Sequence, residues 1–343
     1  MKYNRLGSSD LEVSEVCLGT MTFGQQNTES EAFGLLDVAH DRGVTFLDSA
    51  EMYPVPAREE TQGRSEAIIG QWLAGRDRSR FVVATKVIGR SGMQWIRDGG
   101  GLDRAHIEAA VEDSLRRLRT DYIDLYQLHW PDRYVPKFGG AFFNHDEYYE
   151  GTPIEETVAV LGDLVRAGKI RHYGLSNETP YGVSRFSRAA EALGVAKPVT
   201  IQNAYNLLNR TYDLHLAESC HHEGLQLLPY SPLAFGLLTG KYLGGAKPKG
   251  TRFQLFPFFG ARYLKKVNKD EAIAAYLEVA GEKKLTHLAL QFCRSRSFVA
   301  STIIGATSLD QLNENLDAFE GELSSHELRG ILKVHRKYPN PCV

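Results

Sequence analysis

Eight short apolar runs recur along the chain and constrain its fold more than any other feature. They are rich in Val, Ile, Leu and Tyr and occupy residues 16–18, 45–47, 81–84, 122–128, 170–175, 199–201, 225–228 and 301–304. Runs of this length that are apolar on both faces are typical of strands in a parallel sheet covered on both sides. The runs therefore indicate an α/β fold built around such a sheet.

Helical patterns lie between the runs. Thr152 and Pro153 open a capping box, in which Thr152 caps a helix and the proline takes its first position. Thr179 and the proline after it predict another helix, which Gly194 ends. Ser308 predicts the cap of a further helix. Strand and helix therefore alternate along the chain.

This alternation fits a (β/α)8 TIM barrel, which 343 residues are enough to complete. A doubly wound sheet alternates in the same way but usually has a Gly-x-Gly-x-x-Gly turn after its first strand, and this chain has none there. We predict a single barrel domain spanning residues 1–343, with an N-terminal β-hairpin around residues 8–10. Long loops are expected after strand four (130–151) and strand seven (235–269), and the second contains Phe258 and Phe259.

Composition narrows the partners and the compartment. The chain has 40 basic and 42 acidic residues and a net charge of −2, so no overall positive field favours nucleic acid or an anionic membrane. No apolar stretch reaches the ~20 residues of a membrane helix. The four cysteines contain no Cys-x-x-Cys pair, which favours a reduced, cytoplasmic chain. We expect a small-molecule partner, and the oligomeric state stays open.

The residues that end the apolar runs are the place to look for chemistry, because active sites of such barrels gather at the carboxyl ends of the strands. Asp48 ends the second run, with Tyr53 shortly after it. Lys86 follows the third run and His129 the fourth. Each also has an ordinary structural reading: Asp48 could cap a turn, Lys86 could extend to the surface, and His129 could be a core histidine.

Together these four residues form a chemical set. A buried lysine is costly unless it is paired, and Asp48 is available to Lys86 from the neighbouring strand. An ammonium near Tyr53 is expected to lower the pKa of the phenol from about 10 toward the range of a general acid. His129 could then donate a hydrogen bond to a carbonyl oxygen. Such a site protonates the oxygen of a carbonyl group while another group delivers the second reactant to the carbon of that group.

Residues 43–53, Gly-Val-Thr-Phe-Leu-Asp-Ser-Ala-Glu-Met-Tyr, resemble the aldo-keto reductase signature around the catalytic aspartate and tyrosine. Lys86 and His129 match the lysine and histidine of that family. The resemblance covers nearly the whole chain. Within the family, the chain closely resembles the bacterial Tas-type branch, in residues 51–56, 60–63, 201–203 and 207–210.

The resemblance implies a TIM barrel and an NADP(H)-dependent oxidoreductase that reduces an aldehyde or ketone to an alcohol by hydride transfer. Tyr53 would be the general acid, and Lys86, held by Asp48, would support it. His129 would orient the carbonyl group. The cofactor would lie extended across the strand ends, which agrees with the missing glycine motif.

The resemblance also implies the cofactor contacts. At the nicotinamide end they are Gly19, Thr20, Met21, Asp48, Ser176, Asn177, Gln202 and Tyr230. Over the pyrophosphate they are Ser231, Pro232, Leu233, Gly236, Leu238 and Lys241. At the adenosine end they are Gly305, Thr307, Gln311, Glu314 and Asn315. Many family members carry Lys and Arg where this chain has Gly305 and Gln311, so NAD(H) stays open beside NADP(H), although Lys241 or Thr307 could compensate.

A substrate mouth is predicted around Met21, Phe23, Trp95 and Trp130, which suits aldehydes or ketones of modest size. Two other functions stay open. One is an NADP(H)-binding, redox-sensing or partner-regulating subunit with little turnover. The other is a Schiff-base lyase using Lys86, against which the pairing with Asp48 argues.

A cluster of His215, Cys220, His221 and His222 invites a metal reading. Adjacent histidines on a helix point in different directions, and no acidic or cysteine spacing supports a site. We therefore predict no metal there.

Overall fold

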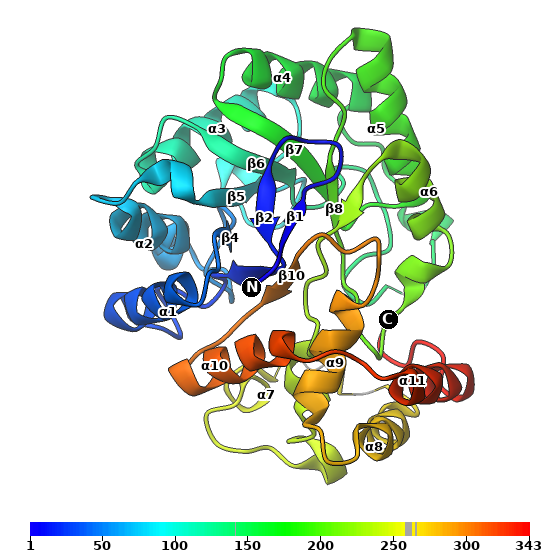
Figure 1. Cartoon of the computed structure of the whole chain (residues 1–343). Helices are drawn as coiled ribbons and strands as arrows, with labels where there is room; N and C mark the ends of the chain where they lie inside the picture. The colour runs from blue at the N-terminus through cyan, green and yellow to red at the C-terminus, as the bar shows by residue number, and fades with distance from the viewer. Residues whose placement is uncertain (141, 258–262, 265) are drawn as a thin grey trace.

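Eight parallel strands form the centre of the molecule (Figure 1). The structure is a computed structural model that describes residues 1–140, 142–257, 263–264 and 266–343. Phe258 and Phe259 of the predicted second long loop lie outside these residues. The strands are β3 (Val16–Gly19), β4 (Phe46–Asp48), β5 (Val82–Val87), β6 (Ile123–Leu128), β7 (Ile170–Ser176), β8 (Thr200–Gln202), β9 (Gln226–Leu227) and β10 (Thr302–Ile304). Each overlaps one predicted apolar run, so all eight strand predictions are confirmed.

The sheet curls and closes into a barrel. Its strand order is β10-β3-β4-β5-β6-β7-β8-β9, with every neighbouring pair parallel. Backbone bonds then join the two ends of this order. Leu227 N–H donates to Phe298 O at 2.8 Å, Ala300 N–H donates to Leu227 O at 3.0 Å, and Ile303 N–H donates to Pro229 O at 3.1 Å. The fold is therefore the predicted (β/α)8 barrel and not a doubly wound sheet.

Helices ring the strands (Figure 1). They are α1 (Glu29–Asp41), α2 (Arg64–Leu73), α3 (Arg104–Leu118), α4 (Ile154–Arg166), α5 (Pro180–Leu193), α6 (Leu216–Glu223), α7 (Arg252–Leu255), α8 (Lys269–Ala280), α9 (Leu285–Arg294), α10 (Leu309–Asp317) and α11 (Ser325–Lys337). The sequence patterns above predict α4, α5 and α10, and α8, α9 and α11 are among the helices that they do not predict. Within the described residues, no helix combines the length and the apolar character needed to cross a bilayer.

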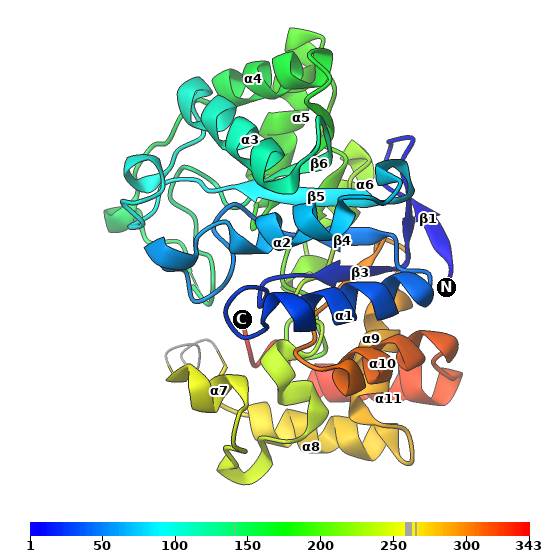
Figure 2. The same cartoon turned by 90° about the vertical axis from the view of Figure 1, so that its left-hand side faces the viewer.

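The two ends of the barrel differ. The antiparallel hairpin of β1 (Tyr3–Arg5) and β2 (Glu12–Ser14) covers one end and lies at the right of Figure 2. The long connections after β6 and β9 extend at the opposite end, where α7 is labelled at the left. The predicted hairpin and both long loops are thus confirmed. The carboxyl ends of the strands and the long loops share one face.

Two of the three helix starts follow the sequence. Thr179 Oγ1 accepts from the N–H of Gly182, the third residue of α5, which ends at Gly194 with φ +64°, and Ser308 caps α10. The capping box at Thr152 is wrong: α4 begins without a side-chain cap, and the Thr152 hydroxyl donates to Asp132 Oδ2 at 2.7 Å. The backbone N–H of Thr152 also donates to Asp132 Oδ2, at 2.9 Å, so Asp132 holds Thr152 outside the helix and Pro153 takes the N-cap position.

Alternation along the strands divides the apolar residues into two cores. The larger lies between the strands and the helices. The smaller fills the barrel interior toward its floor, where Leu6, Leu11 and Val13 of the hairpin segment pack against inward-facing strand residues such as Phe46 and Leu125. The upper part of the interior is left for polar side chains.

Candidate active site

Polar residues stand directly above this apolar floor. Because successive inward positions of a strand are two residues apart, the residue after each floor residue lies one step closer to the open end. These pairs, floor residue first, are Phe46 and Asp48 on β4, Ala84 and Lys86 on β5, and Leu125 and Gln127 on β6. Neighbouring strands thus bring a carboxylate, an ammonium and an amide into contact.

Lys86 pairs with Asp48 at the centre of the barrel. Lys86 Nζ lies 2.6 Å from Asp48 Oδ2 and donates to Ser49 O at 2.5 Å, and its side chain is 0% exposed. Burial alone would lower the pKa of this ammonium, but Asp48, with Tyr53, outweighs the burial and raises it. Lys86 therefore stays charged and committed to these partners.

Tyr53 lies over this pair. Lys86 Nζ is 4.9 Å from the centre of the Tyr53 ring, and the tyrosine is nearly buried, with 9% exposed. Burial raises the pKa of Tyr53, and Lys86 only partly offsets it. The expected lowering of this pKa is therefore wrong, since desolvation of the phenolate outweighs the attraction of the ammonium. Tyr53 is held in its protonated form.

Glu51 fixes the loop that carries Tyr53. Its backbone N–H donates to Lys86 O at 3.1 Å, and its buried carboxylate accepts from Ile88 N–H at 2.7 Å. Arg97 binds the same carboxylate through both terminal nitrogens, at 2.6 and 2.7 Å. The loop after β4 is thereby tied to β5 and to the loop after β5.

His129 completes the group. Its ring meets that of Tyr53 edge-on, with centres 5.7 Å apart and an interplanar angle of 79°. Burial lowers the pKa of His129 well below its usual range, and Lys86 adds to this effect. Its Nδ1 is buried and has no hydrogen-bond partner within the described part of the chain. His129 is therefore a neutral imidazole with hydrogen-bonding capacity to spare.

The lowered pKa of His129 predicts a pH-dependent stability. The unfolded histidine titrates near 6.5, so acid favours the unfolded state, and this histidine costs stability as pH falls below that value. At pH 5.5 the loss from this one group is on the order of 1 kcal/mol. In His129→Gln, the fall in unfolding free energy between pH 7.5 and 5.5 should be smaller by about this amount, measured by urea denaturation. An unchanged fall would contradict a neutral buried His129.

The residues predicted at the nicotinamide end lie together beside Asp48, Tyr53, Lys86 and His129. Ser176 Oγ donates to Gln202 O at 2.7 Å, and Asn177 Nδ2 donates to His129 O at 2.9 Å. Tyr230 OH donates to Asn177 Oδ1 at 2.7 Å. Asn177 has a positive φ of 52°, which turns its side chain back across the strand ends. Polar groups from β7, β8 and the segment after β9 thus form one connected wall.

The first strand contributes less polar surface. The Thr20 hydroxyl donates to Asp48 O at 3.0 Å and is fully buried, and Met21 is partly buried. A Cβ at Gly19 would approach Ile303 Cγ2 to 2.9 Å, so close packing against β10 already requires a glycine there.

The segment predicted over the pyrophosphate is tightly turned. Ser231 and Gly236 have φ values of 54° and 95°. Pro232 and Leu238 are buried and Leu233 is partly buried, so backbone rather than side chains is offered along much of this segment.

Two cations stand beyond this segment. Neither Lys241 nor Arg252 forms an ion pair within the described residues, and Arg252 lies 4.8 Å from the centre of the Phe235 ring. Burial lowers the pKa of both side chains, and the charge of Arg252 lowers the pKa of Lys241 further. Glu314, one of the predicted adenosine-end residues, raises the pKa of Lys241 and so partly opposes this effect. The pair offers unneutralised positive charge to an anion.

The predicted adenosine-end residues surround the start of α10. Gly305, Thr307 and Gln311 are exposed, and Gln311 Oε1 accepts from Thr307 N–H at 3.1 Å. Asn315 Nδ2 donates to Gly305 O at 3.2 Å, and Glu314 pairs with Lys284. A helix start with exposed N–H groups suits an anionic group.

The residues predicted to line the substrate mouth differ in their exposure. Trp130 is nearly buried beside His129, with ring centres 4.7 Å apart, and Phe138 meets it edge-on at 5.9 Å. Trp95 is exposed on the loop after β5. Phe23 is fully buried in the larger core, so its side chain is not presented to a ligand.

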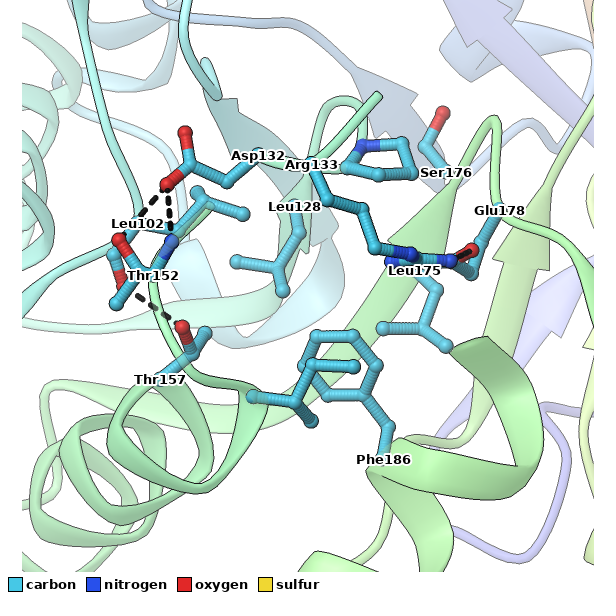
Figure 3. Close-up of a pocket in the computed structure, with 12 residues that line it drawn as sticks. Leu102, Leu128, Asp132, Arg133, Thr152, Thr157, Leu175, Ser176, Glu178 and Phe186 are labelled. Carbon is cyan, nitrogen blue, oxygen red and sulfur yellow. Dashed lines mark hydrogen bonds and ion pairs between the residues drawn. The ribbon is translucent and has the colours of Figure 1, made fainter. Parts of the chain in front are cut away.

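A small cavity beside the site is too small for substrate (Figure 3). Its volume of about 20 Å³ holds about one water molecule. Asp132, bonded to Thr152, and Arg133, paired with Glu178 at 2.7 Å, form two of its walls. These contacts anchor the loop after β6 rather than bind a ligand.

The side chains of the histidine cluster do not come together. His221 and His222 are exposed neighbours on α6, with ring centres 5.4 Å apart, whereas Cys220 is buried. Among the residues that the structure describes, no three His, Cys, Asp or Glu side chains come together as metal ligands.

Sequence reasoning missed two residues of the site. Gln127 has a signal, since it lies two residues before His129 and so shares the inward face of β6. Arg252 has none, because it comes to the site through the long loop after β9.

Comparison with known proteins agrees with this geometry. The Aldo/keto reductase family model matches residues 15–336. "Protein tas" of Escherichia coli (strain K12) is 46% identical over the full length of both chains. An "Uncharacterized oxidoreductase YrpG" of Bacillus subtilis is 32% identical, covering 99% of this chain and 97% of that protein. A "Probable voltage-gated potassium channel subunit beta" of Oryza sativa subsp. japonica is 35% identical, covering 93% and 92%. The chain therefore belongs to the aldo/keto reductase family of oxidoreductases.

Proposed function

We propose that this protein reduces an aldehyde or ketone to an alcohol with NADP(H), using Tyr53 as the general acid. The observation that carries the proposal is the buried Lys86–Asp48 pair beneath a protonated Tyr53, with a neutral His129 at its edge. This arrangement can give a proton to an oxygen and stabilise the phenolate that is left behind.

The protein's own groups divide the work. Tyr53 O–H gives its proton to the oxygen of the carbonyl group as negative charge develops there. The Lys86 ammonium, fixed by Asp48, stabilises the Tyr53 phenolate. His129 donates a hydrogen bond to the same oxygen and orients it. A reduced nicotinamide cofactor, when bound, would supply the hydride for the carbonyl carbon.

NADP(H) fits the residues present. Lys241 and Arg252 offer unpaired charge, and the start of α10 adds exposed N–H groups, which together suit phosphate groups. Gly305 and Gln311 bring no charge. We therefore assign the preference for NADP(H) over NAD(H) to Lys241 and Arg252.

An apolar carbonyl compound fits the mouth. Trp130 is held by a hydrogen bond from its Nε1 to Arg90 O, and it packs with Ile88 and Ile96. Phe138 extends this aromatic surface outward. A planar or apolar group beside the carbonyl would pack on these rings.

The two alternative functions are a Schiff-base lyase, which has less support, and a redox-sensing or partner-regulating subunit, which would act through a partner protein. A Schiff base needs an uncharged, accessible lysine, whereas Lys86 is fully buried, charged and paired. A redox-sensing subunit is supported by the relatives named as potassium channel subunits, which are 35% and 33% identical.

One experiment separates these functions. The protein is titrated with NADPH and with NADH by fluorescence and then assayed with aldehydes, ketones and quinones for NADPH oxidation matched by alcohol formation. Binding with turnover supports the proposal. Binding without turnover on any carbonyl favours the redox-sensing subunit, and a borohydride-trapped adduct at Lys86 favours the lyase. Failure to bind either cofactor overturns the proposal.

Two broader proposals accompany this function. The whole chain, residues 1–343, acts as one domain, because the family match spans residues 15–336 and the barrel uses strands from both ends of the chain. The site of action is the cytoplasm, because all four cysteines are buried in the core, where reduced thiols pack well.

A further inference from the structure

Gln127 sits between the Lys86–Asp48 pair and the nicotinamide-end residues. It is fully buried on β6, one inward step below His129. Gln127 Nε2 donates to Asp48 Oδ1 at 3.0 Å, and Gln127 Oε1 accepts from Gln202 Nε2 at 3.0 Å. Gln202 Nε2 also donates to Asp48 Oδ1, at 2.8 Å. Three side chains from three strands thus form a closed triangle.

Asp48 determines the direction of every bond in this triangle. An ionised carboxylate only accepts, so both amides must turn their NH2 groups toward it. Gln127 must then turn its carbonyl oxygen toward Gln202. Both N–H bonds of Gln202 Nε2 are consumed, one by Asp48 and one by Gln127.

The consequence falls on Gln202 Oε1. No group within the described residues donates a hydrogen bond to this oxygen. The amide cannot flip without breaking two hydrogen bonds, one of them to a charged acceptor. Gln202 is therefore locked as an acceptor on the wall formed by Ser176 and Asn177.

We infer that Gln127 is a positioning residue that locks the Gln202 amide, so that Gln202 Oε1 is kept available to accept from the carboxamide N–H of the cofactor. Gln127 also joins this lock to the Lys86–Asp48 pair through the same carboxylate. The inference rests on the proposed NADP(H) function and adds a residue that acts through Gln202 and Asp48 rather than by touching the reactants.

The test compares two cofactors that differ only in the hydrogen bond at issue. NADPH carries a carboxamide, and its 3-acetylpyridine analogue carries an acetyl group without an N–H. Both dissociation constants are measured by quenching of tryptophan fluorescence, without substrate. The wild-type protein should bind the analogue about fivefold more weakly. In Gln127→Met, which leaves the Gln202 amide held only by its bond to Asp48, the ratio of the two constants should be smaller than in the wild type.

Gln127→Glu separates the two contacts of Gln127. A carboxyl group keeps an acceptor toward Gln202, so the wild-type discrimination between the two cofactors should be retained. It also places a second acid beside Asp48, and two neighbouring carboxylates resist joint ionisation. The pH profile of kcat should therefore move in Gln127→Glu, which a purely structural glutamine would not cause.

Gln291 provides the matched control. It is also a buried glutamine, accepting from Lys283 and donating to Ala318 O at 2.9 Å, but it lies on α9. Gln291→Met should lower the melting temperature and leave the cofactor ratio unchanged. Equal discrimination in wild type and Gln127→Met, or its loss in Gln127→Glu as well, would overturn the inference. Absence of NADPH binding by the wild type would instead overturn the proposed function.

Discussion

Tyr53→Phe should lower carbonyl reduction by a factor of about 10² to 10⁴, the usual contribution of a positioned general acid. The phenyl ring keeps the volume and the edge-on contact with His129. The variant loses the Tyr53 hydroxyl beside the Lys86–Asp48 pair, and with it the proton for the developing alkoxide. NADPH affinity should stay within about twofold of wild type, because the described hydrogen bonds of the nicotinamide-end wall join Ser176, Asn177, Gln202 and Tyr230 to one another and to His129.

This prediction is measured as single-turnover oxidation of bound NADPH by an aldehyde, together with fluorescence titration of NADPH. Tyr148→Phe is the control, because Tyr148 is an exposed tyrosine on the long loop after β6 and should keep wild-type kinetics. Near-normal reduction by Tyr53→Phe would remove Tyr53 from the acid role and leave water or His129 as the proton source.

The barrel could be predicted because its signal is repeated. Eight apolar runs with helical patterns between them admit few folds, and the same alternation sets which strand residues face inward. Asp48, Lys86 and His129 could be named because each ends a run at the same face. These inferences need only the sequence period and the strand direction.

What the sequence could not supply depends on distances between segments far apart in the chain. The pKa of Tyr53 is decided by the balance between its burial and the nearby Lys86, and composition gives neither. Thr152 bonds to Asp132 across a loop instead of capping its own helix. The amide directions of Gln127 and Gln202 follow from a carboxylate that both share.

Arg252 comes to the site through the long loop after β9, so its position there could not be predicted from the sequence. Its loss should weaken NADPH binding more than NADH binding. Arg252→Ala should raise the dissociation constant of NADPH by about 10- to 100-fold, the range for hydrogen bonds to a charged group. The constant for NADH should rise by less than about threefold, since NADH lacks the 2′-phosphate.

The reason lies in where the chain puts its positive charge. With a net charge of −2 and uncharged residues at Gly305 and Gln311, any preference for the extra phosphate must come from local cations. Lys241, which is exposed, and Arg252, which is partly buried, have no carboxylate partner among the described residues, and the repulsion between their charges is relieved when an anion binds near them. Lys249→Ala, which changes an exposed lysine of the same loop, should leave both constants unchanged. Equal weakening of NADPH and NADH in Arg252→Ala would move Arg252 to the pyrophosphate, which both cofactors share, and leave the choice between them to Thr307 and Gln311.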